Sequence, residues 1–383
     1  MTQVSRILYM PTRIVHGLGC VADLAGQVKA VGGSTAFVCT DGGLTAAGVT
    51  ATVTSHLERA GVPFVVFDDV KEDPGVETVA AGVERFREGA CDVVVALGGG
   101  SPMCAGKGIA LVAANGGVLT DYEGFNKAAG PPYPVIALPT TAGSGTEVSK
   151  VTILTDEGRD FKMSILDERT FPRVALLDAT LMETLPAWPA LVAGMDALAH
   201  ALDAVWSIGA TLFSDDLAVT SAATIFESLA LAALTGDLAA KQRMLEASSA
   251  ANMATGTALP GLAHVLSQPL GRYHIAHGLG TGIVLPYTME FNLPVAAGKL
   301  APIARLLGCV GSDRECAEEL LGRLWELMEE VGFPTCLDAE IVQEDDLPLL
   351  VEQCTQVVNY KLNMRRASPA DLTHLYRRAL GRE

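Results

Sequence analysis

The first half of the sequence alternates short β-rich runs with helical stretches, and this alternation constrains the fold more than any other feature. Four such runs are apolar and rich in β-branched residues, and they lie at 34–41, 63–69, 92–101 and 134–141. Strands that are covered on both faces are continuously apolar, and helical segments between them are typical of crossover connections. The pattern therefore predicts an α/β domain with a parallel sheet.

The second half has no strand pattern beyond about residue 185. Long Ala- and Leu-rich stretches with helical character continue to the end, for example at 299–308 and 317–332. A chain of 383 residues is also too long for one typical core, which favours two domains. We therefore expect an α/β domain over 1–184 and an all-α domain over 185–383.

Charge and cysteine content limit the possible partners and the compartment. The formal net charge of −17 argues against nucleic acid and against anionic membranes, because both would repel the chain, so a small molecule is the expected partner. The eight cysteines form no CxxC pair, which indicates reduced thiols and a cytoplasmic protein. The N-terminus has no apolar signal-peptide core, and the apolar run 217–236 contains Glu227, which favours a buried helix over a membrane span.

The third β-rich run leads directly into Gly98, Gly99, Gly100 and Ser101. A loop without side chains at the end of a strand lets backbone N–H groups approach a phosphate, although a tight turn without a ligand gives the same pattern. Five residues separate Gly100 from the next glycine, whereas a Walker loop requires four. We therefore expect a nucleotide other than one bound by a Walker loop.

A second loop rich in glycine and threonine, 139–147, follows the fourth β-rich run. Both loops are expected at the carboxyl edge of one sheet, where hydroxyls and amides suit a ligand with several polar oxygens. The standard dinucleotide fingerprint places an acidic residue about 20 positions after its glycines, but the acidic candidate here, Asp41, precedes them. A nucleotide site at this edge would differ from the standard Rossmann arrangement.

The segment 194–200 places Asp196 and His200 four residues apart in a stretch of Gly, Ala, Leu and Met. Residues at this spacing lie on one face of a helix, and a buried carboxylate is rare unless it is paired or binds a metal. A hydrogen bond between the two side chains is the simpler explanation. However, three of the seven histidines are His264, His274 and His277, so a set of ligands for iron or zinc is available, with His274 as an alternative to His277.

Six segments of the chain resemble motifs of the iron-containing (group III) alcohol dehydrogenases and occur in the same order as in that family. They are 98–102, 121–127, 138–147, 194–200, 261–264 and 277–278. These enzymes are related to glycerol dehydrogenase and dehydroquinate synthase. The resemblance covers nearly the whole chain. It implies a dehydroquinate-synthase-like fold, with an N-terminal nicotinamide-binding domain, an all-α C-terminal domain and a catalytic metal in the cleft between them.

The resemblance also implies roles for individual residues. The metal ligands would be Asp196, His200, His264 and His277. The cofactor-binding residues would be Asp41, Gly98, Gly99, Gly100, Ser101, Thr140, Thr141, Lys162 and Leu181. Because the Asp41 carboxylate would accept hydrogen bonds from ribose hydroxyls and repel a 2′-phosphate, NAD is expected rather than NADP.

The sequence departs from the family pattern at three positions. Cys104 replaces the usual Asp of the glycine motif, Asp73 replaces an Asn before Pro74, and Gln268 replaces a second histidine. Because of the last change, the route by which the proton reaches solvent is open. We expect His274, Gln268 with a water molecule, or a ribose hydroxyl to carry the proton. His277 is expected to act in catalysis as a metal ligand.

We therefore expect an NAD- and metal-dependent alcohol dehydrogenase or aldehyde reductase, with iron favoured over zinc, acting on a small alcohol or aldehyde as a homodimer or larger assembly. Three potential cations, Lys150, Arg272 and His274, suggest a substrate with an anionic tail such as a carboxylate, sulfonate or phosphonate, and Thr255 would leave room for that tail. The alternative is that these side chains are solvated or paired with nearby carboxylates. Rival hypotheses are a transhydrogenase or lyase on the same scaffold, and a metal-binding protein without turnover.

Overall fold

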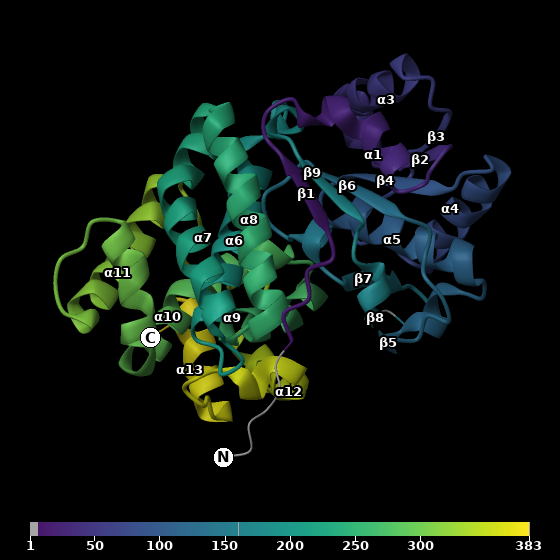
Figure 1. Cartoon of the computed structure of the whole chain (residues 1–383). Helices are drawn as coiled ribbons and strands as arrows, with labels where there is room; N and C mark the ends of the chain where they lie inside the picture. Colours follow the sequence, from purple (N-terminus) through teal and green to yellow (C-terminus); the bar gives the residue numbers. More distant parts are fainter. Residues whose placement is uncertain (1–6, 160, 383) are drawn as a thin grey trace. The chain divides into compact units, whose positions relative to one another are not determined.

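The computed structural model describes residues 7–159 and 161–382, which divide into two compact units (Figure 1). The N-terminal unit is Met10–Leu185. The helical unit begins at Pro186 and also includes the described N-terminal residues up to Tyr9. The expected α/β domain began at residue 1. In the structure, the described residues before Met10 belong to the helical unit instead.

The N-terminal unit is built on a six-stranded sheet with the order β1-β9-β6-β4-β2-β3, in which every neighbouring pair is parallel. The strands are β1 (Arg13–His16), β2 (Ala36–Cys39), β3 (Phe64–Phe67), β4 (Val93–Gly98), β6 (Val135–Pro139) and β9 (Val174–Leu177). Its helices are α1 (Leu24–Ala30), α2 (Gly42–Ala46), α3 (Val49–Arg59), α4 (Val76–Glu88) and α5 (Gly100–Asn115). The predicted α/β class with a parallel sheet is confirmed.

The central strands are apolar at every position because both faces of the sheet are covered. In β2, Phe37 and Cys39 belong to one buried apolar cluster, whereas Ala36 and Val38 belong to another. The four predicted strands correspond to β2, β3, β4 and β6. The sequence pattern missed β1 and β9, and also a small sheet of β5 (Gly124–Phe125), β7 (Val151–Asp156) and β8 (Phe161–Leu166).

Every regular element described in the helical unit is a helix, as the sequence predicts. These are α6 (Ala187–Val205), α7 (Leu212–Ala230), α8 (Leu238–Ala258), α9 (Leu262–Ser267), α10 (His277–Leu306), α11 (Asp313–Glu330), α12 (Leu347–Gln356) and α13 (Pro369–Ala379), with short 3₁₀ and π turns between them. Helix α6 packs against α7, α8 and α10. The element that carries the Asp196 motif is therefore surrounded by other helices.

Helix α7 and the turn that follows it form the one segment of the described residues that is long and apolar enough to cross a membrane. It spans Leu212–Thr235, and the mean hydropathy of its most apolar part is 1.7. Half of that part is buried, and α7 packs along α6 and α8. Core helices commonly have this composition, which agrees with the buried helix expected for 217–236.

The short helix α9 is held by side chains from the last two helices. The Cys354 thiol of α12 donates to the Val265 carbonyl at 3.3 Å, and the Tyr376 hydroxyl of α13 donates to the Leu266 carbonyl at 2.6 Å. Both side chains are fully buried. These bonds satisfy carbonyls at the end of α9 and fix its position.

Candidate active site

Four predicted metal ligands converge in the helical unit. Asp196 and His200 lie one turn apart on α6, His264 lies on α9, and His277 is the first residue of α10. The Nε2 atoms of His200, His264 and His277 lie 3.7, 3.9 and 3.7 Å from the Asp196 carboxylate oxygens. The Nε2 atoms of His200 and His264 are 3.4 Å apart. One ligand atom each of Asp196, His200 and His264 lies within 4.8 Å of the others, and the His277 ring lies beside this group, next to Asp196.

The chemistry of this cluster fits a divalent metal. Asp196 is 5% exposed, and its Oδ1 atom has no hydrogen-bond partner among the described residues. A buried carboxylate oxygen without a donor is costly, and a cation would remove that cost. Three imidazoles and one carboxylate are a ligand set for iron or zinc.

The electrostatic surroundings of Asp196 and His200 also favour a cation. Burial opposes the charge of Asp196, but the imidazoles of His277, His200 and His264 lower its pKa below the usual value. Burial, together with His264, lowers the pKa of His200 to about 3. His200 is therefore neutral at physiological pH, which is the protonation state that binds a metal.

The four ligands differ in their exposure to solvent. The exposed fraction of the side chain is 7% for Asp196, 8% for His264 and 14% for His200, but 48% for His277. The cluster is therefore closed on three sides and open beside His277.

Polar groups also lie behind two of the imidazoles. The Nδ1 atom of His264 is 2.7 Å from the Asp203 carboxylate, and the Nδ1 atom of His200 is 3.4 Å from the Thr255 hydroxyl. Thr255, predicted to leave room for a substrate, is buried and donates its hydroxyl proton to the Ala251 carbonyl. Its observed contacts are with a candidate ligand and its own helix.

In the N-terminal unit, the glycine run forms the turn between β4 and α5. Gly98 has φ +146°, and a Cβ atom there would lie 2.5 Å from Cγ of Pro102, so only glycine fits this turn. Gly99 is the N-cap of α5, a helix of 16 residues. Backbone amides and the positive end of the helix dipole therefore meet at Gly99–Ser101, which is an arrangement suited to a phosphate.

The second predicted loop lies beside the first. The Thr140 amide donates to the Gly98 carbonyl at 3.1 Å, because β6 and β4 are neighbours in the sheet. A Cβ atom on Gly99 would lie 3.2 Å from the Thr141 hydroxyl. The structure thus brings together the glycine run and both threonines, as the sequence predicts.

A pocket of about 440 Å³ opens at the carboxyl ends of β4, β2 and β3. Its lining residues are Asp41, Gly42, Gly43, Val70, Lys71, Glu72, Gly99, Gly100, Ser101 and Pro102. The chain runs outward from β2 to β3 and then returns to the other side of β2 as β4, so the pocket lies where the strand order reverses. Such switch points are the usual ligand sites of open parallel sheets. Asp41 also caps α2, accepting from the Leu44 amide at 2.9 Å.

Lys107 is a residue to which the sequence pattern assigns no role. It lies on α5, is 1% exposed, and donates to the carbonyls of Ser149 and Val151 at 2.7 and 2.8 Å. The Thr170 hydroxyl donates to the carbonyl between them, that of Lys150, at 2.6 Å. Three consecutive carbonyls are therefore fixed at the base of the Lys150 side chain. A lysine inside an apolar helical stretch is the sequence signal for such a role.

The remaining cofactor positions and family departures lie in different surroundings. The Lys162 ammonium pairs with Asp73 at 2.8 Å, so two of the singled-out residues contact each other. Leu181 is 2% exposed and belongs to the apolar core of the N-terminal unit. Cys104 is also buried, and burial raises the pKa of its thiol.

The candidate proton-transfer residues Gln268 and His274 are both exposed, and His274 has φ +57°. Arg272 lies over the Tyr273 ring at 5.8 Å. Arg272 also lies near the carboxylate of Asp346. The pKa of Asp346 is lowered by a hydrogen bond from the Gln343 amide, by a second from Tyr273 and by the charge of Arg272.

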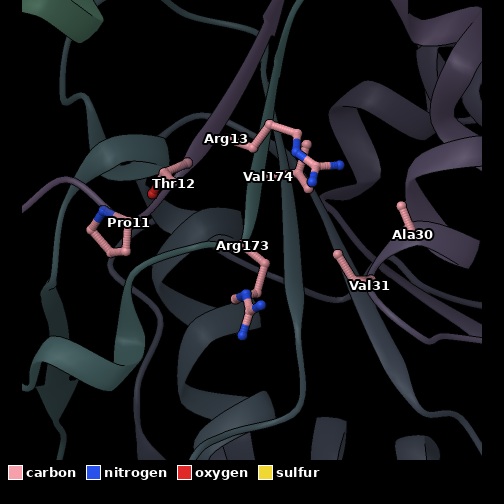
Figure 2. Close-up of a pocket in the computed structure, with 7 residues that line it drawn as sticks. All are labelled: Pro11, Thr12, Arg13, Ala30, Val31, Arg173 and Val174. Carbon is pink, nitrogen blue, oxygen red and sulfur yellow. The ribbon is translucent and has the colours of Figure 1, made fainter.

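A smaller pocket of about 210 Å³ lies at the amino ends of β1 and β9 (Figure 2). It is lined by Pro11, Thr12, Arg13, Ala30, Val31, Arg173 and Val174. The two arginine side chains do not point toward each other (Figure 2). The Arg13 guanidinium is 3.4 Å from the Gln27 side chain. A ligand site requires convergent polar groups, which this pocket lacks.

Comparison with known proteins gives matches along the whole chain. Residues 11–179 match the family described as iron-containing alcohol dehydrogenase, and residues 190–380 match the C-terminal family of Fe-containing alcohol dehydrogenases. The chain is 34% identical to the NAD-dependent methanol dehydrogenase of Bacillus methanolicus over 97% of its own length and 99% of that protein.

Two solved structures are also similar. A 1,3-propanediol oxidoreductase is 31% identical, with a TM-score of 0.94, and the match covers 98% of this chain and 100% of that one. The sulfoacetaldehyde reductase of Bifidobacterium kashiwanohense, in complex with NAD+, is 27% identical with a TM-score of 0.90, and the match covers 98% of this chain and 99% of that one.

Proposed function

Since the chain belongs to the iron-containing alcohol dehydrogenase family, we propose that Asp196, His200, His264 and His277 hold its catalytic metal, iron rather than zinc, for hydride transfer between NAD and a small alcohol or aldehyde. The observation that carries this proposal is the Oδ1 atom of Asp196, which has no hydrogen-bond partner among the described residues and faces Nε2 of His264 and of His277, while His200 faces the other oxygen. Such a metal, when bound, polarises the oxygen of the substrate as a Lewis acid.

Other residues of the chain are proposed to bind the cofactor and to transfer the proton. We assign the glycine run, with Thr140 and Thr141 beside it, to the pyrophosphate of NAD, because Gly99, Gly100 and Ser101 line the pocket at the amino end of α5. Lys162 and Leu181 remain proposed cofactor contacts. Gln268 and His274 are proposed to pass the proton to solvent, and the exposure of both side chains supports this role.

The test is an NADH-linked screen of short alcohols and aldehydes with iron-loaded and zinc-loaded protein. We expect NADH to form from added NAD and alcohol, and more rapidly with iron. Turnover that consumes no added NAD would favour a transhydrogenase or lyase with a tightly held cofactor. Protein that binds metal but neither NAD nor NADH would favour a metal-binding role without turnover.

The N-terminal pocket predicts how cofactor preference would change. We propose that Asp41 accepts hydrogen bonds from the adenosine ribose, since its carboxylate lines the pocket together with the glycine run. Asp41→Asn removes the charge but can still cap α2. We expect this variant to bring the kcat/KM values for NAD and NADP closer together by about tenfold, because the repulsion of a 2′-phosphate is lost.

Asp41→Gly, which also removes the cap, separates the effect of charge from that of local stability. If both variants keep the wild-type ratio of NAD to NADP, Asp41 does not lie at the ribose.

We further propose a substrate with an anionic tail, such as a short aldehyde with a carboxylate, sulfonate or phosphonate. Lys150 supports this proposal, because the backbone beneath it is fixed by Lys107 and Thr170 and no ion pair of its side chain is present among the described residues. The relative named sulfoacetaldehyde reductase gives further support. Arg272 is the weaker candidate, because Asp346 lies near it.

A comparison of sulfoacetaldehyde with a neutral aldehyde of similar size tests this substrate class. We expect kcat/KM to favour the anionic compound, and Lys150→Ala to reduce that preference about tenfold through loss of a charge-assisted hydrogen bond. Arg272→Ala measures the contribution of the second cation. A preference for the neutral aldehyde, or an unchanged ratio in both variants, would return the substrate to simple alcohols and aldehydes.

We also propose that the enzyme works in the cytoplasm as a homodimer or larger assembly. The eight cysteines without a CxxC pair support a reducing compartment. Light scattering of the purified protein would give its assembly state.

A further inference from the structure

Behind His264 lies a carboxylate with no solvent exposure, that of Asp203 on α6. Its Oδ2 atom lies 2.7 Å from Nδ1 of the His264 ring and accepts from the His264 amide at 3.1 Å. Its Oδ1 atom accepts from the Trp206 indole at 2.7 Å and from the Ala263 amide at 3.2 Å. Each oxygen thus has two neighbouring donors, and the carboxylate has one orientation only.

We propose that Asp203 is the positioning residue of the metal centre. A carboxylate oxygen accepts, so the His264 ring carries a proton on Nδ1, and Nε2 is the atom that faces Asp196 and would bind the proposed metal. This inference rests on the proposed function. The same carboxylate accepts from two amides of the first turn of α9, so it fixes both the ring and the helix that carries the ring.

The surroundings of Asp203 leave no space for another arrangement. Trp206 is fully buried. A Cβ atom on Gly261 would lie 2.7 Å from Oδ1 of Asp203 and 2.9 Å from the Trp206 indole nitrogen. The close approach of α9 to this pair therefore requires glycine at 261, and the three residues form one rigid support.

His200 offers a comparison within the same cluster. Its Nδ1 atom faces the neutral Thr255 hydroxyl at 3.4 Å, whereas His264 faces a charged group at 2.7 Å. Hydrogen bonds to ionised acceptors are about twice as strong as neutral ones. Asp203 should therefore influence metal binding more than Thr255 does.

The test uses Asp203→Asn in the full-length protein. An amide has one acceptor atom, so either the His264 side or the Trp206 side loses its acceptor. We expect the affinity for Zn²⁺, measured by competition with a chelator, to fall about 10- to 100-fold, and the visible spectrum of the Co²⁺-loaded protein to change. Thr255→Val should weaken Zn²⁺ binding by less.

Asp178→Asn is the matched control for the loss of a buried carboxylate. Asp178 also has no solvent exposure and accepts from the amides of Gly19 and Val21, but it lies in the N-terminal unit. This variant should keep the wild-type Zn²⁺ affinity and Co²⁺ spectrum. If Asp203→Asn does not fold, Trp206→Phe, which removes one donor to Oδ1, should weaken Zn²⁺ binding about fivefold.

The inference would be overturned if Asp203→Asn kept both the wild-type Zn²⁺ affinity and the wild-type Co²⁺ spectrum. The same holds for Trp206→Phe if that variant has to be used instead. An equal loss in Asp178→Asn would do so as well. Wild-type protein without a stoichiometric metal site would instead overturn the proposed function, and this inference with it.

Discussion

His264→Ala is expected to lose bound metal and turnover together, while the affinity for NAD stays close to that of the wild type. His264 is buried and its ring lies between Asp196 and Asp203, so alanine removes a ligand and leaves two carboxylates without their partner. The glycine run belongs to the other unit. Since a metal contributes several kcal/mol to transition-state stabilisation, kcat/KM should fall by about 10³-fold or more.

Metal analysis, NADH-linked kinetics and a fluorescence titration with NADH measure the three quantities. His277→Ala should show the same loss of metal and turnover, although His277 is half-exposed whereas His264 is buried. His374→Ala is the control, because His374 is an exposed histidine of the same unit outside the cluster. Unchanged metal content in both His264→Ala and His277→Ala would remove the proposed centre.

Lys107→Met is expected to destabilise the N-terminal unit by about 3 kcal/mol, because two partly buried carbonyls lose a charged donor while a similar volume is kept. For a unit of this size the melting temperature should fall by roughly 6–12 °C. All three tryptophans, Trp188, Trp206 and Trp325, lie in the helical unit. Calorimetry should therefore show an early transition that tryptophan fluorescence does not follow. A single unshifted transition would contradict this expectation.

The same lysine predicts a pH dependence with a definite sign. Burial lowers the pKa of Lys107 from 10.5 to about 8. Between these values the unfolded chain holds a proton that the folded unit has released, so the free energy of unfolding should rise with pH across this window. The increase should be smaller in Lys107→Met, and an identical pH profile in both proteins would show that Lys107 is not the group responsible.

The sequence predicts the parallel sheet and the shared helix face of Asp196 and His200 because both depend on local spacing, whereas the complete set of proposed ligands came from the family resemblance. The buried strands are continuously apolar, and Asp196 and His200 are four residues apart on a helix. Contacts between distant segments have no such signal. Asp203 and His264 are 61 positions apart, and Thr255 faces His200 only because α8 packs on α6.

Short or partly exposed elements were missed for a different reason. In β1 (Arg13–His16) none of the four residues is fully buried, so no apolar run marks it. The sequence assigned no role to Lys107, because its two acceptors are carbonyls of another segment, 42 and 44 positions away.

The support of α9 by Cys354 and Tyr376 has a consequence for biosynthesis. Helix α13 supplies no candidate ligand, yet the Tyr376 hydroxyl binds the Leu266 carbonyl two residues beyond His264. A nascent chain whose α13 is still inside the ribosome lacks this bond, although Asp196, His200 and His277 have already been made. Domains fold as units during synthesis, and a metal site forms only when its scaffold is folded. We therefore expect metal to be captured only after α13 has emerged from the ribosome.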